Sequence, residues 1–111
     1  MAQNIDPRQL ARLVQLSEAL RDRDLARLSA AGKAVAAIDR HLAALDQPLP
    51  APGDVAAALA QHRYDGWADA RRRLLLPERA RLEAERQSAA DQARLSFGRA
   101  LALGRIRDQL S

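Results

Sequence analysis

The 111-residue sequence contains no cysteine and only three aromatic residues, Tyr64, Trp67 and Phe97. Without cysteine the chain forms neither a disulfide nor a thiolate metal site. So few large rings also argue against a compact core of the usual kind. Alanine, leucine, arginine, glutamine and acidic residues dominate instead. This composition is typical of long helices that gain their stability by packing along a narrow seam.

The sequence also lacks long apolar runs. None approaches the roughly 20 residues that a helix needs to cross a bilayer. The opening residues, MAQNIDPRQL, show no basic segment followed by an apolar one, so no secretory signal is expected. We therefore expect a cytoplasmic protein, with peripheral membrane association as an alternative. The segment SFGRALALGRIRDQL is partly amphipathic, but its apolar stripe is better used in helix pairing.

The formal net charge is +4, and all but one of the positive residues are arginines. Residues 71–107 hold ten arginines against Glu78, Glu83, Glu85 and Asp91, whereas the first 53 residues are nearly balanced. This asymmetry favours an acidic protein surface or a nucleic acid as partner. A solvated helix face is the favoured explanation, because charged positions are what helices expose to water.

The first predicted helix spans about residues 7–46. Asp6 suits its N-cap and Pro7 its first position. From Leu28 onward the apolar residues alternate in steps of three and four, which predicts a heptad seam. The eight-residue interval between Leu20 and Leu28 predicts a stutter in that seam. The predicted seam residues are Leu10, Leu13, Leu16, Leu20, Leu28, Ala31, Val35, Ile38, Leu42 and Leu45.

The proline-rich stretch DQPLPAPGD ends this helix and predicts a loop over residues 47–53. Asp54 is suited to cap a short helix over 54–63, which Tyr64-Asp65-Gly66 ends or bends. A second long helix is predicted over about 66–109. The predicted seam near its end consists mostly of small residues: Ala89, Ala93, Ser96, Ala100, Leu103 and Leu110. Pro77 lies inside it, and a kink is the favoured outcome, with a true break as the alternative.

Two long helices joined by a short loop predict an all-α, antiparallel two-helix coiled-coil hairpin, with a short helix or bend after the proline-rich turn. Residues 1–111 are expected to form this single hairpin. Both termini then lie at the same end.

The sequence shows no constellation for catalysis, so the chain is not expected to be an enzyme or to bind a cofactor. Gly32-Lys33 lacks the remaining residues of a phosphate-binding loop. His41 and His62 are the only histidines, and no carboxylates accompany them at metal-ligand spacing, so no metal site is predicted.

Nucleic-acid binding is disfavoured. Arg72, Arg79 and Arg86 align at intervals of seven, but glutamates four residues after Arg79 and Arg81 neutralise part of this stripe. No aromatic residues are interleaved for base stacking, and no DNA-binding helix motif is present.

Two segments carry a resemblance to a known family. LARLVQLSEALRDRDLARLSAAGKAVAAIDRHLAAL resembles the first helix of the FliJ and YscO proteins of flagellar and injectisome type III export. The return segment, with Tyr64 and Trp67 early and ADQARLSFGRALALGRIRDQL at its end, resembles the second. The resemblance is one of length, heptads and basic C-terminal end. The LPAPG loop and Pro77 depart from it.

The resemblance implies a non-catalytic stalk or adaptor protein. Its partners would be a hexameric export ATPase, an export gate and substrate chaperones, contacted through the paired helix ends. The residues that this implies as partner-binding are Arg8, Arg12, Arg94, Arg99, Arg105 and Arg107. Arginine suits bidentate contact with carboxylates. The alternative is a generic coiled-coil adaptor or a self-associating structural protein.

Overall fold

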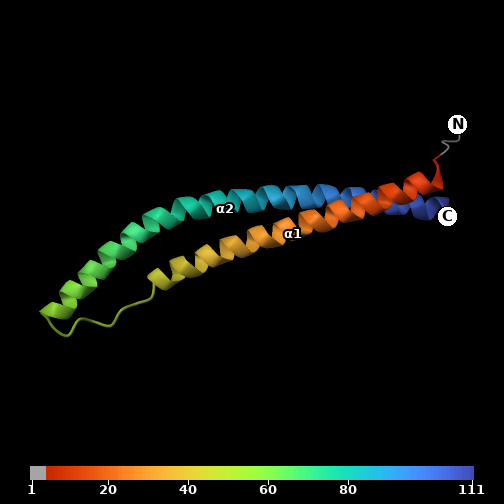
Figure 1. Cartoon of the computed structure of the whole chain (residues 1–111). Helices are drawn as coiled ribbons and strands as arrows, with labels where there is room; N and C mark the ends of the chain where they lie inside the picture. The colour runs from red at the N-terminus through yellow and green to blue at the C-terminus, as the bar shows by residue number, and fades with distance from the viewer. Residues whose placement is uncertain (1–4) are drawn as a thin grey trace. The chain divides into compact units, whose positions relative to one another are not determined.

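The computed structural model describes residues 5–111 as two α-helices joined by one loop (Figure 1). Helix α1 spans Pro7–Leu45 and helix α2 spans Val55–Leu110. No strand occurs in residues 5–111, and the fold is the all-α helical hairpin that the sequence predicts. The first four residues of MAQNIDPRQL, in which no secretory signal was expected, lie outside the described part.

Both helices begin with an aspartate cap. The Asp6 carboxylate accepts a hydrogen bond of 3.0 Å from the amide of Arg8, and Pro7 takes the first helical position. The Asp54 carboxylate accepts one of 2.7 Å from the amide of Ala57. Each cap satisfies an amide that the first turn of a helix leaves unpaired. The capping role predicted for Asp6 and Asp54 is therefore confirmed.

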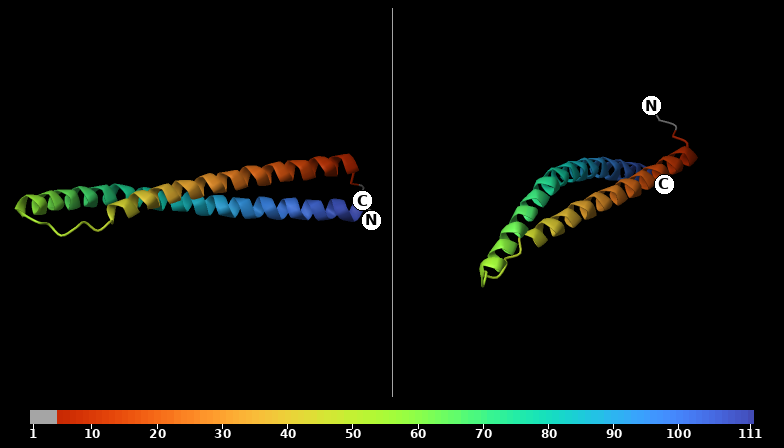
Figure 2. Two further views of the ribbon diagram at one scale, coloured as in Figure 1. Left: turned by 90° about the horizontal axis from the view of Figure 1, so that it is seen from below. Right: turned by 60° about the vertical axis from the view of Figure 1, so that its left-hand side comes forward.

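The hairpin divides into two units. Unit 1 contains residues 5–31 and Glu85–Ser111, and unit 2 contains Gly32–Ala84. In each, a part of α1 runs antiparallel to a part of α2, as Figure 2 shows from two directions. In unit 2, Asp39 meets Arg79 while Asp46 meets Arg72, so the numbering rises along one helix as it falls along the other.

The seam of α1 differs from the one predicted. The buried residues of α1 all fit one unbroken heptad, and half-buried residues occupy its remaining positions: Leu10, Val14, Ser17, Arg21, Asp24, Leu28, Ala31, Val35, Ile38, Leu42 and Leu45. Leu13 and Leu16, both placed in the seam by the sequence, expose 49% and 56% of their surface. The stutter between Leu20 and Leu28 is therefore wrong.

Polar residues are accepted in the seam because each has a hydrogen-bond partner. The hydroxyl of Ser17 donates to the carbonyl of Val14 at 2.8 Å, and the hydroxyl of Ser96 donates to the carboxylate of Asp24. The facing residues Ala93, Ser96 and Ala100 are small and buried, as the sequence predicts for this part of α2. Leu110, which was predicted to continue that seam, is exposed instead.

Helix α2 is a single helix where the sequence predicts a short helix over 54–63 and a long one over 66–109. Gly66 costs only about 1 kcal/mol within a helix, and local contacts offset it. The rings of Tyr64 and Trp67 lie 5.7 Å apart, and Ala68 is buried. The separate short helix is therefore wrong.

Pro77 lies inside α2 without ending it. The break considered as an alternative does not occur. Proline removes one backbone hydrogen bond and crowds the preceding turn, which favours curvature. In Figure 1 the helix is curved along its green and teal part, within unit 2.

Candidate protein-binding surface

The six arginines predicted to bind a partner all lie in unit 1, and all are exposed. Arg8 and Arg12 belong to the first turns of α1, whereas Arg99, Arg105 and Arg107 belong to the last turns of α2. We call the parts of α1 and α2 within residues 5–20 and 96–111 the terminal end of unit 1. Arg107 shares a small pocket with Ile5, Pro7 and Leu10, so the two helices meet there. Arg94 lies outside this end.

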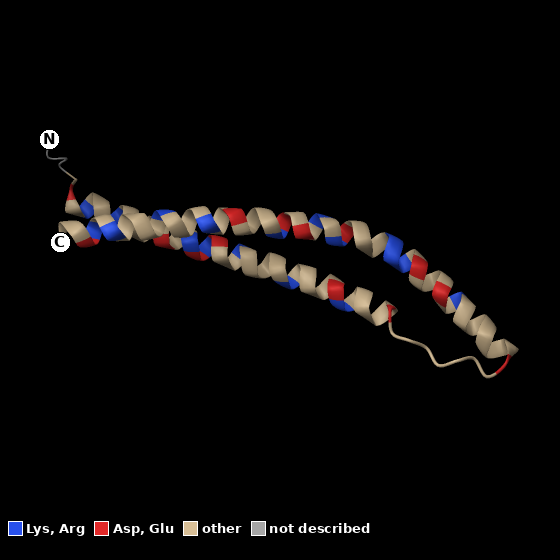
Figure 3. Cartoon of the chain, turned by 180° about the vertical axis from the view of Figure 1, so that it is seen from behind, with Lys and Arg blue, Asp and Glu red and all other residues tan. Residues whose placement is uncertain are grey.

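Their ion pairs divide these arginines into two groups. Arg94 pairs with Asp91 on its own helix at 3.0 Å, and Arg107 pairs with Asp108 at 3.4 Å. Within residues 5–111, Arg8, Arg12, Arg99 and Arg105 have no carboxylate partner for their side chains. Figure 3 shows several Lys and Arg bands and few Asp and Glu bands along this end of both helices. These four guanidinium groups are available for a carboxylate from outside the chain.

An apolar groove lies between the two helices of unit 1. Its volume is about 380 Å³. We call it the leucine groove, and its lining residues are Leu13, Leu16, Ser17, Leu20, Ser96, Arg99, Ala102 and Leu103. The sequence missed this surface because it assigned the three leucines of α1 to the seam. The available signal was the spacing of Leu10, Val14, Ser17 and Asp24, which continues the later heptad only if polar seam residues are allowed.

The buried carboxylate of Asp24 is part of the seam of unit 1. It receives the hydroxyl of Ser96 across the helix pair and the Arg23 guanidinium at 3.2 Å, while Arg27 lies 3.9 Å away. The Ser96 hydrogen bond has the largest influence and, with Arg23, lowers the pKa of Asp24 below its ordinary value, although burial acts in the opposite direction. The group therefore stays ionised and paired at neutral pH.

Two of the three arginines in the stripe considered for nucleic acid, Arg72 and Arg79, are used inside unit 2. Arg72 donates to the carbonyl of Leu45 at 2.9 Å and to the Asp46 carboxylate at 2.9 Å, and it pairs with Asp69 at 2.7 Å. Partial burial acts to lower the pKa of Arg72, but these carboxylates raise it overall. Arg79 forms a two-point contact with Asp39 across the helix pair. These arginines therefore serve the fold.

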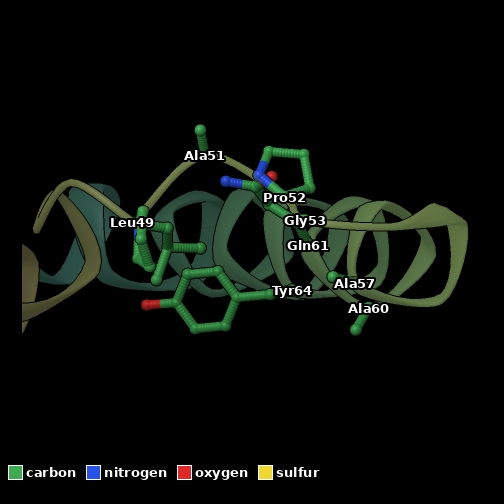
Figure 4. A pocket seen from close by; sticks show the side chains of 9 residues that line it. Leu49, Ala51, Pro52, Gly53, Ala57, Ala60, Gln61 and Tyr64 are labelled. Carbon is green, nitrogen blue, oxygen red and sulfur yellow. The ribbon is translucent and has the colours of Figure 1, made fainter.

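A second concave surface lies at the loop end of unit 2. The loop folds back along the first turns of α2, and Leu49 lies beside the ring of Tyr64 (Figure 4). Nearby, Trp67 exposes 56% of its surface beside His41 and Arg71. Prolines and small residues form most of the loop pocket, and no charged side chain lines it. It completes the turn but offers little chemistry.

Across the described part of the chain, no three His, Asp or Glu side chains gather as metal ligands would. Along the same residues, neither helix has a stretch both long and apolar enough to pass through a bilayer. His41 and His62 stand on different helices and are both exposed. In comparisons with protein-family models, curated proteins and solved structures, the chain matches none of them.

Proposed function

We propose that the chain is a non-catalytic hairpin that binds a protein partner through the terminal end of unit 1. The observation that carries this proposal is the group of exposed arginines without carboxylate partners among residues 5–111, namely Arg8, Arg12, Arg99 and Arg105. Arginine forks bind carboxylates in two-point geometry. The neighbouring leucine groove adds apolar area to the same surface. An acidic protein surface fits both features.

In its finer form, the proposal is a stalk or adaptor of a flagellar or injectisome type III export apparatus. Its partners would be a hexameric export ATPase, the export gate and substrate chaperones. This form rests on the resemblance to the FliJ and YscO family and on the agreement between a hairpin and the expected stalk. The proposed location is the cytoplasm, with peripheral association at the inner membrane as an alternative.

The second candidate function is a generic coiled-coil adaptor or a self-associating structural protein. The exposed leucines favour it, because uncovered apolar surface is also what a helical assembly buries. Nucleic-acid binding has less support, because Arg72 and Arg79 are paired within unit 2.

The test is capture of partners from a lysate of the source organism with the purified full chain, followed by mass spectrometry. The informative variant is Arg8→Glu, Arg99→Glu, Arg105→Glu. The matched control reverses three exposed unit 2 arginines, Arg63→Glu, Arg71→Glu, Arg73→Glu, which have no carboxylate partners among the described residues. We expect the wild type and the control to recover a hexameric export ATPase, and the informative variant to lose it.

Recovery should also fall as salt rises, because exposed charge contacts are screened. Equal recovery of the ATPase by all three proteins would contradict the role of the terminal end. Recovery of only other helical proteins, or of the chain itself, would favour the second candidate function.

A further inference from the structure

The leucine groove is open and mostly apolar, and it is formed by both helices. Leu13 and Leu16 each expose about half of their surface into it or beside it, and Leu103 closes the opposite wall. Val14 and Ser17 are seam positions of the heptad. Leu13 and Leu20, seven residues apart, occupy the same heptad position beside the seam. The groove therefore runs along the helix pair, and its shape suits a third helix that lies along it.

The charge at the edges of this groove has one sign. Arg99 is the only charged residue in its lining, and Arg12 lies one helical turn before the lining residue Leu16, on the same face of α1 as that leucine. Neither has a carboxylate partner within residues 5–111. The acidic residues of α1 nearest to the groove leucines in the sequence are Glu18 and Asp22. In the heptad, both lie on the other side of the seam from Leu13 and Leu20.

We propose that the leucine groove binds one amphipathic helix of a partner protein, with apolar side chains at three- and four-residue spacing toward the leucines and carboxylates toward Arg12 and Arg99. This rests on the proposed function, that unit 1 binds protein, and it specifies the partner segment. Apolar anchors supply the buried area, while charge complementarity selects the partner and speeds association. A second copy of this chain fits poorly, because two facing grooves would bring Arg12 and Arg99 toward their own copies.

The probe is a panel of fluorescein-labelled helical peptides of about 18 residues, or five turns. Each has leucines at alternating three- and four-residue spacing with glutamates on both flanks, and the panel varies the leucine register. A second panel replaces every glutamate by lysine. Binding to the full chain is followed by fluorescence anisotropy, and the site is mapped by amide chemical shifts of the 15N-labelled chain.

Two pairs of variants separate the groove from the rest of unit 1. Leu16→Glu adds a charge to the groove, and its control is Leu101→Glu, a similarly exposed leucine of α2 outside the groove lining. Arg99→Glu reverses the charge of the lining, and its control is Arg105→Glu, an exposed arginine outside it. Circular dichroism checks that all four variants remain helical.

We expect at least one glutamate peptide to bind and to shift the amides of the groove residues. The lysine peptides should bind at least about tenfold more weakly than the glutamate peptides. A factor of ten corresponds to about 1.4 kcal/mol. Leu16→Glu should lose about tenfold in affinity and Leu101→Glu less than about twofold. Arg99→Glu should shift the preference toward lysine peptides, whereas Arg105→Glu should not.

The inference is overturned if no glutamate peptide binds, if the shifts map outside the groove, or if Leu16→Glu binds as the wild type does. It is also overturned if the chain alone forms a dimer that Leu16→Glu dissociates, because the occupant is then a second copy. These outcomes are separable from the proposed function. Peptide binding without ATPase capture removes only the export assignment, whereas ATPase capture unaffected by Leu16→Glu removes only the groove.

Discussion

Unit 2 uses its seam arginines internally, whereas the terminal end of unit 1 leaves four of its five arginines without carboxylate partners among residues 5–111. In unit 2, Arg72 and Arg79 face carboxylates across the helix pair at positions seven residues apart. After Arg86, the same series continues in unit 1 with Ala93 and Ala100, and the four arginines without carboxylate partners stand outside the seam. Charge in a seam stabilises a helix pair only where a partner lies opposite. Charge outside it is available for another molecule.

The two units also differ in what fills the seam. Val35, Ile38 and Leu45 give unit 2 branched apolar contacts. Unit 1 has such contacts only from Leu10 and Val14 among its fully buried residues, and otherwise buries small or polar residues, among them Ala93, Ala100, Ser17 and Asp24. A small-residue seam lets helices approach closely but buries less apolar area, and the hydrophobic contribution follows that area. The four predictions below test this contrast, from the largest expected effect to the smallest.

Ile38→Ala should destabilise the hairpin most. Ile38 is buried in unit 2, and truncation of a buried isoleucine costs about 2 to 4 kcal/mol, since it removes apolar contact and leaves a void. Urea unfolding followed by circular dichroism measures the loss. The control is Leu16→Ala, which should change stability by less than about 0.5 kcal/mol because Leu16 is exposed. A similar loss of stability from Ile38→Ala and Leu16→Ala would support the seam that the sequence predicts, in which Leu16 is buried.

Asp24→Asn tests the polar seam of unit 1 and should have a smaller effect. The folded-state pKa of Asp24 lies below its unfolded value, so its contribution is present above the ordinary aspartate range. That contribution is lost as pH falls through the folded-state pKa. When the pH falls from 6 to about 3, the urea concentration at the unfolding midpoint should therefore decrease more for the wild type than for the variant.

Glu78, whose pKa is lowered by Arg81, should contribute the same acid dependence to both proteins. Ser96→Ala should behave like Asp24→Asn, because it removes the hydrogen bond that has the largest influence on this carboxylate. Parallel pH profiles for all three proteins would show that Asp24 does not carry the difference.

The Arg79–Asp39 contact should contribute a modest coupling to unit 2. Both side chains are more than a third exposed, so solvent screens the pair. A double-mutant cycle with Arg79→Ala and Asp39→Ala should give a coupling free energy of about 0.5 kcal/mol at low salt, decreasing as salt rises. A coupling of zero at low salt would mean that the contact with Asp39 does not stabilise unit 2.

Arg99→Glu should affect stability least. Arg99 is exposed and has no carboxylate partner within residues 5–111, so its replacement should change the free energy of unfolding by less than about 0.5 kcal/mol. Thermal unfolding of the variant beside the wild type checks this. A large loss would place Arg99 in the fold and weaken its assignment to a partner.

Sequence patterns predicted the helical hairpin, the two caps and most of the unit 2 seam, because proline, aspartate caps and repeated leucines act locally. They missed most of the α1 side of the unit 1 seam, because they assigned Leu13, Leu16 and Leu20 to it, whereas the structure buries Val14, Ser17 and Asp24. Whether a seam accepts an aspartate depends on a hydroxyl 72 residues away, at Ser96. The predicted interruption at Gly66 failed for a related reason, because helix propensity is weak compared with tertiary packing.

The candidate site was located by sequence only in part. All six predicted arginines are exposed in unit 1, but Arg94 and Arg107 pair with neighbouring acids, and the leucine groove was not foreseen. The sequence by itself determined two helices, their caps and the proline-rich turn, because these depend on residues close together in the chain. Only the tertiary structure decided which leucines are buried, which arginines pair across the helices and where a groove remains, because each of these depends on residues that the hairpin brings together from its two helices.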